Sequence, residues 1–285
     1  MNTGIKAIFV ANMLLAALPG IAAPREVFFN SLDGTVIKAW VFPPTEKLAK
    51  GTVKGTVIAL HGCGGLYASG GRNKGLFNAR HQAMADLLVA EGYAAVFPDS
   101  FTPRGESSIC VQKIGMRKID QSERRADTLA TLDWVAAQPW GQATRTALLG
   151  WSHGGSAVLG ATDVARAEVR RRPVQPAVGI AFYPGCSAAL KSGYRMGAPL
   201  VMMLAEKDDW TPPAPCIELG KAVGAEVNIY PDSYHDFDSP TGRVQLRKDV
   251  PNGVNPGQGV HVGPNPAARE AAYARLREIL RKALP

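Results

Sequence analysis

The segment G-W-S-H-G at residues 150–154 constrains the fold more than any other part of the sequence, because it joins a strand-like run to a helix-compatible stretch. The apolar run Ala147-Leu148-Leu149 precedes it, and residues 156–172 follow it. A G-x-S-x-G segment between a strand and a helix is typical of a nucleophile elbow, a tight turn that lifts one serine clear of a sheet. Ser152 is therefore the candidate nucleophile, and the alternative is a glycine-rich turn with an exposed serine.

Strand-like and helix-like segments alternate along the chain after an N-terminal β-hairpin that turns at Asp33-Gly34. The hairpin spans residues 27–30 and 36–42; the expected later strands are 56–60, 94–98, 146–149, 178–183, 200–205 and 227–230, and the expected helices are 79–91, 123–138, 156–172 and 266–283. This alternation predicts an α/β fold, with a mostly parallel central sheet and helices on both faces. Ligands of such sheets bind at the carboxyl ends of the strands.

A serine hydroxyl needs a histidine to take its proton and a carboxylate to orient that histidine. In chains with a nucleophile elbow, the acid and then the histidine come later in the sequence, each at the end of a later strand. The run 200–205 ends at Asp208 and Asp209, and the run 227–230 ends shortly before His235. We expect Asp208 and His235 to complete a catalytic triad with Ser152, since Asp208 comes first off its strand. Asp209 and His261 are the alternatives; His261 lies in a Gly/Pro-rich segment with no strand expected before it.

When a serine attacks a carbonyl group, the carbonyl oxygen becomes an oxyanion, which two backbone N–H donors must stabilise. His153 follows the nucleophile and is expected to supply one. The strand at 56–60 runs into H-G-C-G-G at residues 61–65, whose glycines let backbone amides approach a ligand, and Cys63 is expected to supply the other. The alternative for this loop is a phosphate cradle, but it lacks the glycine spacing of a dinucleotide fingerprint, and no G-K-[ST] follows.

These motifs, in this order, resemble those of the dienelactone hydrolase family of α/β-hydrolases. The matching segments are H-G-C-G-G at 61–65, G-Y at 92–93 leading to P-D-S-F at 98–101, Arg104-Gly105, G-W-S-H-G-G at 150–155, Asp208 with Pro212, and H-D-F at 235–237. The enzymes that name the family use a cysteine nucleophile where this chain has Ser152, and their first core loop has a different sequence with an acidic residue. The resemblance therefore implies hydrolysis of an ester or a lactone and does not define the substrate.

Four residues are candidates for substrate contacts. Arg104 lies where similar enzymes carry an arginine that binds a substrate carboxylate, a task that suits a guanidinium group; a surface ion pair is the alternative. Trp151, Tyr183 and Trp210 flank the proposed catalytic positions and are candidates to wall an apolar pocket. The alternative for these aromatic residues is packing in the core.

The N-terminus has the pattern of a signal peptide. Lys6 provides a positive charge, residues 7–18 are apolar, and Ile21-Ala22-Ala23 is an acceptable cleavage site. We expect residues 1–23 to be removed. The full chain is 46% hydrophobic, enough for a large core, and we expect residues 24–285 to form a single catalytic domain. This domain would be exported, either to the periplasm or as a secreted protein. A buried N-terminal helix is the alternative. No lipoprotein cysteine stands at the cleavage point, and no stable membrane anchor is expected.

Export gives the four cysteines a structural interpretation, because disulfides persist in oxidising compartments. Cys186 and Cys216 lie beyond consecutive expected strands, and so do Cys63 and Cys110. We expect these two pairs to form disulfides that join loops near the active site. Two alternatives for Cys63 are weaker: it has no elbow to act as a nucleophile, and with His61 it lacks the ligand spacing of a zinc site.

The sequence therefore predicts a hydrolase of small-molecule esters or lactones that needs no cofactor and no metal. The formal net charge is +8, but the basic residues are dispersed apart from Arg170-Arg171-Arg172, and no nucleic-acid-binding motif is present. Two other functions stay open: a peptidase of the prolyl-oligopeptidase type, whose elbows are similar, and a non-catalytic exported binding protein on a hydrolase scaffold. The sequence does not define an oligomeric state.

Overall fold

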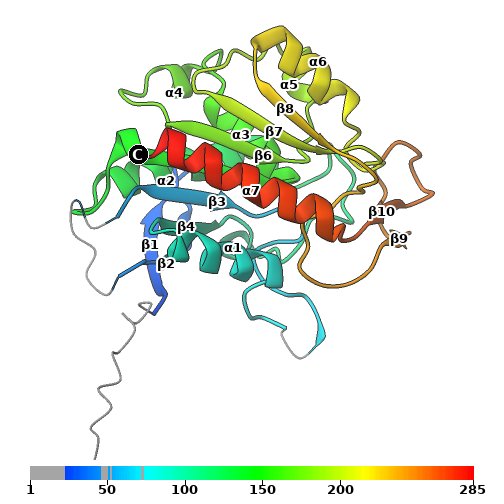
Figure 1. The fold of residues 1–285 in the computed structure, drawn as a ribbon, viewed down its shortest axis with the longest axis horizontal. Helices are drawn as coiled ribbons and strands as arrows, with labels where there is room; N and C mark the ends of the chain where they lie inside the picture. Colours follow the sequence, from blue (N-terminus) through cyan, green and yellow to red (C-terminus); the bar gives the residue numbers. More distant parts are fainter. Residues whose placement is uncertain (1–22, 46–50, 52, 72–73) are drawn as a thin grey trace, which may run out of the picture.

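The computed structural model describes residues 23–45, 51, 53–71 and 74–285, and an eight-stranded sheet runs through its centre (Figure 1). In spatial order the strands are β1 (Arg25–Asn30), β2 (Val36–Phe42), β4 (Ala94–Asp99), β3 (Thr56–Leu60), β5 (Thr146–Trp151), β6 (Val178–Phe182), β7 (Leu200–Ala205) and β8 (Glu226–Tyr230). The hairpin β1–β2 joins β4 in antiparallel pairing, and the strands from β4 to β8 are parallel. The α/β class, the mostly parallel sheet and the N-terminal hairpin are confirmed.

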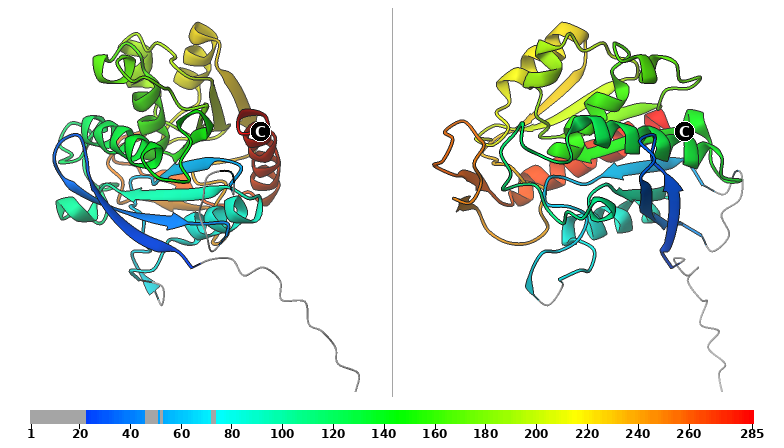
Figure 2. Two further views of the ribbon diagram at one scale, coloured as in Figure 1. Left: turned by 90° about the vertical axis from the view of Figure 1, so that its left-hand side faces the viewer. Right: turned by 180° about the vertical axis from the view of Figure 1, so that it is seen from behind.

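Helices cover both faces of the sheet, as expected. The helices of the α/β layers are α1 (Ala79–Ala90), α2 (Gln121–Ala136), α3 (His153–Thr162), α6 (Ala214–Val223) and α7 (Pro266–Ala283). Helices α1 and α7 lie on the face towards the viewer in Figure 1, and α2 and α3 cover the opposite face, seen from behind in Figure 2. Along β3, Val57 and Ala59 pack on the side of α1 and α7, whereas Ile58 and Leu60 pack on the side of α2 and α3. Because successive strand residues point to opposite faces, one buried strand serves two cores.

The helix expected at residues 156–172 is wrong as a single element. Helix α3 ends at Thr162, and the short helix α4 (Ala167–Arg170) follows as a separate turn. Asp163 separates them: it has an extended backbone, and its Oδ1 accepts hydrogen bonds from the backbone N–H groups of Ala165 and Arg195. An aspartate that satisfies backbone donors in this way competes with the helix, so the chain turns here.

Apart from the two short 3-10 helices at residues 102–104 and 143–145, four elements in the described part of the chain were not expected. They are α5 (Ser187–Lys191), α6, and the two short antiparallel strands β9 (Gln245–Arg247) and β10 (Val260–Val262). His261, expected in an irregular loop, lies in β10. The signal peptide was predicted at residues 1–23, and all of it except residue 23 lies outside the described residues. No helix among the described residues is long and apolar enough to cross a membrane.

The turn between β5 and α3 depends on glycine. A Cβ on Gly150 would lie 2.3 Å from the carbonyl oxygen of Gly154, and a Cβ on Gly154 would lie 2.0 Å from the carbonyl oxygen of Leu60, at the end of β3. Real Cβ atoms do not approach backbone oxygens so closely. The first turn of α3 can therefore pack against the ends of β5 and β3 only with glycine at these positions.

We predict that Gly154→Ala lowers the free energy of unfolding by about 1–3 kcal/mol, the usual cost of overpacking a close contact. Gly160→Ala is the matched control, because it lies in the same helix and its Cβ would come no closer than 3.9 Å to the side chain of Arg125. This control should be neutral or slightly stabilising, since alanine favours helix over glycine. Urea unfolding of both variants measures the difference, and equal stabilities would contradict the packing argument.

Candidate active site

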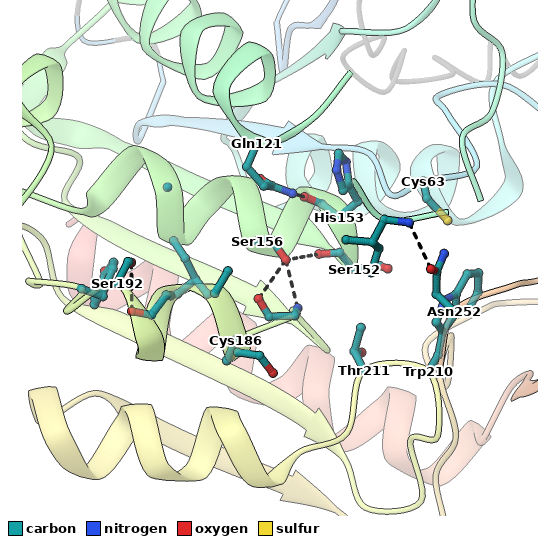
Figure 3. Close-up of a pocket in the computed structure, with 18 of the residues that line it drawn as sticks. Cys63, Gln121, Ser152, His153, Ser156, Cys186, Ser192, Trp210, Thr211 and Asn252 are labelled. Carbon is teal, nitrogen blue, oxygen red and sulfur yellow. Dashed lines mark hydrogen bonds between the residues drawn. The ribbon is translucent and has the colours of Figure 1, made fainter. Parts of the chain in front are cut away.

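A cavity of about 540 Å³ opens at the carboxyl ends of the strands, and Ser152 lies in its wall. It extends along α3 from Ser152 past Ser156 to Gly160, with residues of α5 on one side. Figure 3 shows Cys63, Trp210 and Asn252 around Ser152 at one end and Ser192 at the other. Residues that follow the carboxyl ends of four parallel strands line the cavity: Cys63 after β3, Ser152 after β5, Gly185 after β6 and Trp210 after β7.

Ser152 has the strained backbone of an elbow residue. Its φ of 53° and ψ of −116° lie outside the regions that residues with a Cβ usually occupy. The surrounding contacts hold it there: its N–H donates to the carbonyl of Phe182 at 2.9 Å, and its carbonyl accepts the N–H of Ser156 at 2.9 Å. Such strain costs about 1–3 kcal/mol and persists only where the surroundings impose it.

Ser156 links this elbow to the loop after β6. Its hydroxyl lies 3.4 Å from the carbonyl oxygen of Ser152, and it also bonds to both the N–H and the carbonyl of Gly185 (Figure 3). The sequence did not single out Ser156, although its position one turn beyond Ser152 on the helix would have placed it beside the elbow.

Two backbone amides border the elbow. His153 is the first residue of α3, and the N–H at that position has no acceptor within its own helix. The loop of Cys63 lies against the elbow, because a Cβ on the adjacent Gly62 would be 3.6 Å from the Cβ of Ser152. Both Cys63 and His153 line the cavity together with Ser152.

Asp208 and His235 form a buried pair. Their side chains are each about 1% exposed, and Nδ1 of His235 lies 2.7 Å from Oδ2 of Asp208. The carboxylate also accepts the backbone N–H groups of Trp210 and Thr211 at 2.9 and 2.8 Å and the Thr211 hydroxyl at 3.0 Å. With all these donors, Asp208 has a fixed orientation and holds the imidazole through Nδ1. Thr211 was missed by the sequence reasoning, although Asx turns two or three residues after an aspartate are a recognisable signal.

The pKa of His235 differs in direction from those of three other histidines. Burial lowers the pKa of His61 and His153 well below the usual value and that of His81 to about 3, and nearby arginines add to the effect. Burial also acts against the charged form of His235, but the charge and hydrogen bond of Asp208 outweigh it and raise this pKa. His235 therefore has a carboxylate that stabilises its protonated form.

Asp209 has a different partner. Its Oδ2 lies 2.6 Å from Nδ1 of His261, and its Oδ1 accepts the backbone N–H of His261 at 2.8 Å. Its carbonyl accepts the N–H of Val254. The two aspartates left open by the sequence thus belong to two separate Asp–His pairs, and the Asp209–His261 pair is the more exposed one. Asp209 anchors the segment between Val254 and His261 beside the cavity.

Trp151 and Tyr183 do not wall the cavity, so that expectation is wrong. Both side chains are buried, and their polar atoms donate to the carboxylate of Asp238, the Trp151 indole at 2.8 Å and the Tyr183 hydroxyl at 2.5 Å. Arg80 lies 3.5 Å from the same carboxylate and hydrogen-bonds to the Tyr183 hydroxyl. The Tyr183 ring also packs 4.6 Å from that of His235. Asp238, which sequence reasoning missed, therefore ties the strand before Ser152 to the residues around His235.

Trp210 does line the cavity, and its ring centroid lies 4.7 Å from that of His235. Arg104, by contrast, is not among the lining residues. Its guanidinium makes two hydrogen bonds to Asp127, at 2.9 and 2.8 Å, and another to Asp33 at 2.6 Å. These carboxylates occupy its donors, so the structure supports the ion-pair alternative over binding of a substrate carboxylate.

The two predicted disulfides are confirmed: Cys63 bonds to Cys110, and Cys186 bonds to Cys216. The first joins the loop after β3 to the loop before α2, and the second joins α5 to α6. The Cys63 sulfur is therefore not a free thiolate for nucleophilic attack or for zinc. Among the described residues no three histidine, cysteine or acidic side chains converge as metal ligands would.

Comparisons with known proteins identify the family and the fold. The model of the dienelactone hydrolase family matches residues 71–284. A comparison with curated protein sequences finds no match. Among solved structures, a putative dienelactone hydrolase from Klebsiella pneumoniae is 16% identical, with a TM-score of 0.62 over 91% of this chain and 99% of that one.

Two further structures are similar in fold. A dienelactone hydrolase-like promiscuous phosphotriesterase from metagenomic libraries is 16% identical, with a TM-score of 0.64 over 93% of this chain and 100% of its own. Esterase 2 of Thermogutta terrifontis, in the form phosphoramylated by tabun, is 16% identical, with a TM-score of 0.57 over 93% of this chain and 98% of that one.

Proposed function

The chain belongs to the dienelactone hydrolase family of the α/β-hydrolase superfamily, and from this premise we propose that it is a serine hydrolase of carboxylic esters or lactones. The observation that carries the proposal is the buried hydrogen bond between Asp208 and His235. Trp210 and Thr211, which contact His235, line the cavity that contains the elbow serine. A buried Asp–His pair prepares an imidazole to accept a serine proton. Residues from about 24 onward form the catalytic domain in this proposal.

In the first half of the reaction, Ser152 Oγ attacks the ester carbonyl carbon while His235 takes its proton. Asp208 keeps Nδ1 of the imidazole protonated and stabilises the imidazolium that forms. The carbonyl oxygen becomes an oxyanion and accepts hydrogen bonds from the amides of His153 and Cys63. One lost oxyanion donor costs about 10²–10³ in kcat in other acyl-transfer enzymes, so these amides would contribute substantially.

In the second half, the tetrahedral intermediate collapses and the bond to the leaving oxygen breaks. His235 donates its proton to that oxygen, and the acyl group stays on Ser152. The alcohol of an ester departs, whereas the alcohol of a lactone stays attached to the acyl group as a hydroxyl. Water then attacks the acyl-enzyme with His235 again as the base, and the acid is released with Ser152 restored. Apart from this water, the nucleophile, the base and the oxyanion donors of both halves belong to the chain itself.

The proposal extends to export of the protein after removal of a signal peptide. The two disulfides support it, because disulfides form and persist in oxidising compartments. One cysteine of each pair, Cys63 and Cys186, lines the cavity, so each disulfide ties part of the cavity wall to a second segment of the chain.

We predict that a fluorophosphonate probe labels the protein and that Ser152→Ala abolishes labelling and ester turnover. Asp208→Asn should lower kcat by about 10⁴, the effect of losing the orienting carboxylate in a comparable triad. Asp209→Asn is the matched control, because the adjacent carboxylate pairs with His261 instead. An unlabelled wild-type protein would favour a binding role. A greater loss of kcat in Asp209→Asn than in Asp208→Asn would make Asp209 the triad acid instead of Asp208.

The pH dependence of kcat/KM provides a second test. His235 acts as a base only when neutral, and Asp208 raises its pKa above the ordinary value of 6.5. A raised pKa keeps the imidazole protonated to higher pH, so kcat/KM should fall on the acid side with a midpoint above pH 6.5. In Asp208→Asn the residual activity should show this midpoint at lower pH. A midpoint that does not move in the variant would contradict the pairing.

A further inference from the structure

The rim of the cavity beside Ser152 exposes large apolar side chains. Ile114 is 72% exposed and Val254 is 53% exposed, yet both line the same cavity as Ser152. They come from separate loops, one before α2 and one between β9 and β10. An exposed apolar patch that continues into a cavity is typical of a surface that binds an apolar group.

Asn252 holds these two loops together. Its Oδ1 accepts the backbone N–H of Ile114 at 3.1 Å (Figure 3). Its Nδ2 donates to the carbonyl of Gln112 at 3.0 Å. Each loop has a further anchor close to the site: the Cys63–Cys110 disulfide for the first, and the hydrogen bond from Val254 to the carbonyl of Asp209 for the second. Ile114 and Val254 are therefore held in position before any ligand arrives, which reduces the entropic cost of binding.

Trp210 indicates which part of an ester this rim would contact. It lines the cavity, and its ring packs against His235 at 4.7 Å between centroids. His235 must donate its proton to the departing oxygen, so the alcohol portion has to pass on the side of the imidazole. The acyl portion can then extend in the other direction, along α3 past Ser156.

Resting on the proposed function, we propose that Ile114, Val254 and Trp210 form a binding subsite for an apolar alcohol portion of the ester. Asn252 is a positioning residue of this subsite, because it joins the two loops that carry Ile114 and Val254. The substrate class is thus an ester of an alkyl or aryl alcohol large enough to reach the rim.

The test measures kcat/KM for two ester series with the full mature protein. The first series keeps the acetyl group and lengthens the alcohol from ethyl to octyl acetate; the second keeps ethanol and lengthens the acyl group from acetate to octanoate. The wild type should gain about threefold to fourfold per methylene in the first series while the chain reaches the rim. Ile114→Asp should lower the ratio of kcat/KM for octyl acetate to that for ethyl acetate by at least about tenfold, because a carboxylate replaces apolar contact.

Met116→Asp is the matched control. Met116 lies on the same loop and is 76% exposed, but it does not line the cavity, so the same charge there should leave the ratio at the wild-type value. If the wild type hydrolyses ethyl acetate but its kcat/KM does not rise as the alcohol is lengthened, the subsite is overturned and the proposed function is not. The subsite is also overturned if Ile114→Asp lowers kcat/KM only for esters with longer acyl groups, or if Met116→Asp lowers the octyl-to-ethyl acetate ratio as much as Ile114→Asp. A wild type that neither hydrolyses any ester nor reacts with a fluorophosphonate would overturn the proposed function as well.

Discussion

The backbone of Ser152 is the constraint on which the rest of the site depends. Ser152, between β5 and α3, has a positive φ, and backbone hydrogen bonds to Phe182 and Ser156 offset the strain energy of this conformation. The turn is tight enough to form only because Gly150 and Gly154 allow backbone atoms to touch. One consequence is that α3 begins in the wall of the cavity with N–H groups that have no acceptor within the helix.

The other parts of the site are loops, and each is tied to a rigid element. Asp208 fixes His235 and the turn that carries Trp210 and Thr211, while Asp238 joins Trp151 and Tyr183 behind them. The disulfides and Asn252 hold the outer loops. These contacts are made before a substrate binds, so the groups of the proposed mechanism need little reorganisation, which is the main physical requirement for stabilising a transition state.

Much of this arrangement could be predicted from the sequence, because glycine spacing and strand ends are local signals. They identified the elbow, the sheet and both disulfide pairs. The errors at the site concern partners that lie far away in the chain: Arg104 pairs with Asp33 and Asp127, and Trp151 and Tyr183 donate to the buried Asp238. Asp208 and Asp209 are neighbours with the same chemistry, and only the fold shows that one meets His235 and the other His261. No local pattern distinguishes such choices.

The most direct test of Ser152 as the nucleophile is a crystal structure of the protein after reaction with an organophosphonate ester. We predict a covalent bond from Ser152 Oγ to phosphorus, with the phosphonyl oxygen within hydrogen-bond distance of the backbone nitrogens of Cys63 and His153. His235 should lie beside the site of the departed group, with its bond to Asp208 intact. An adduct on another residue, or a phosphonyl oxygen directed away from both amides, would contradict the proposed catalytic arrangement.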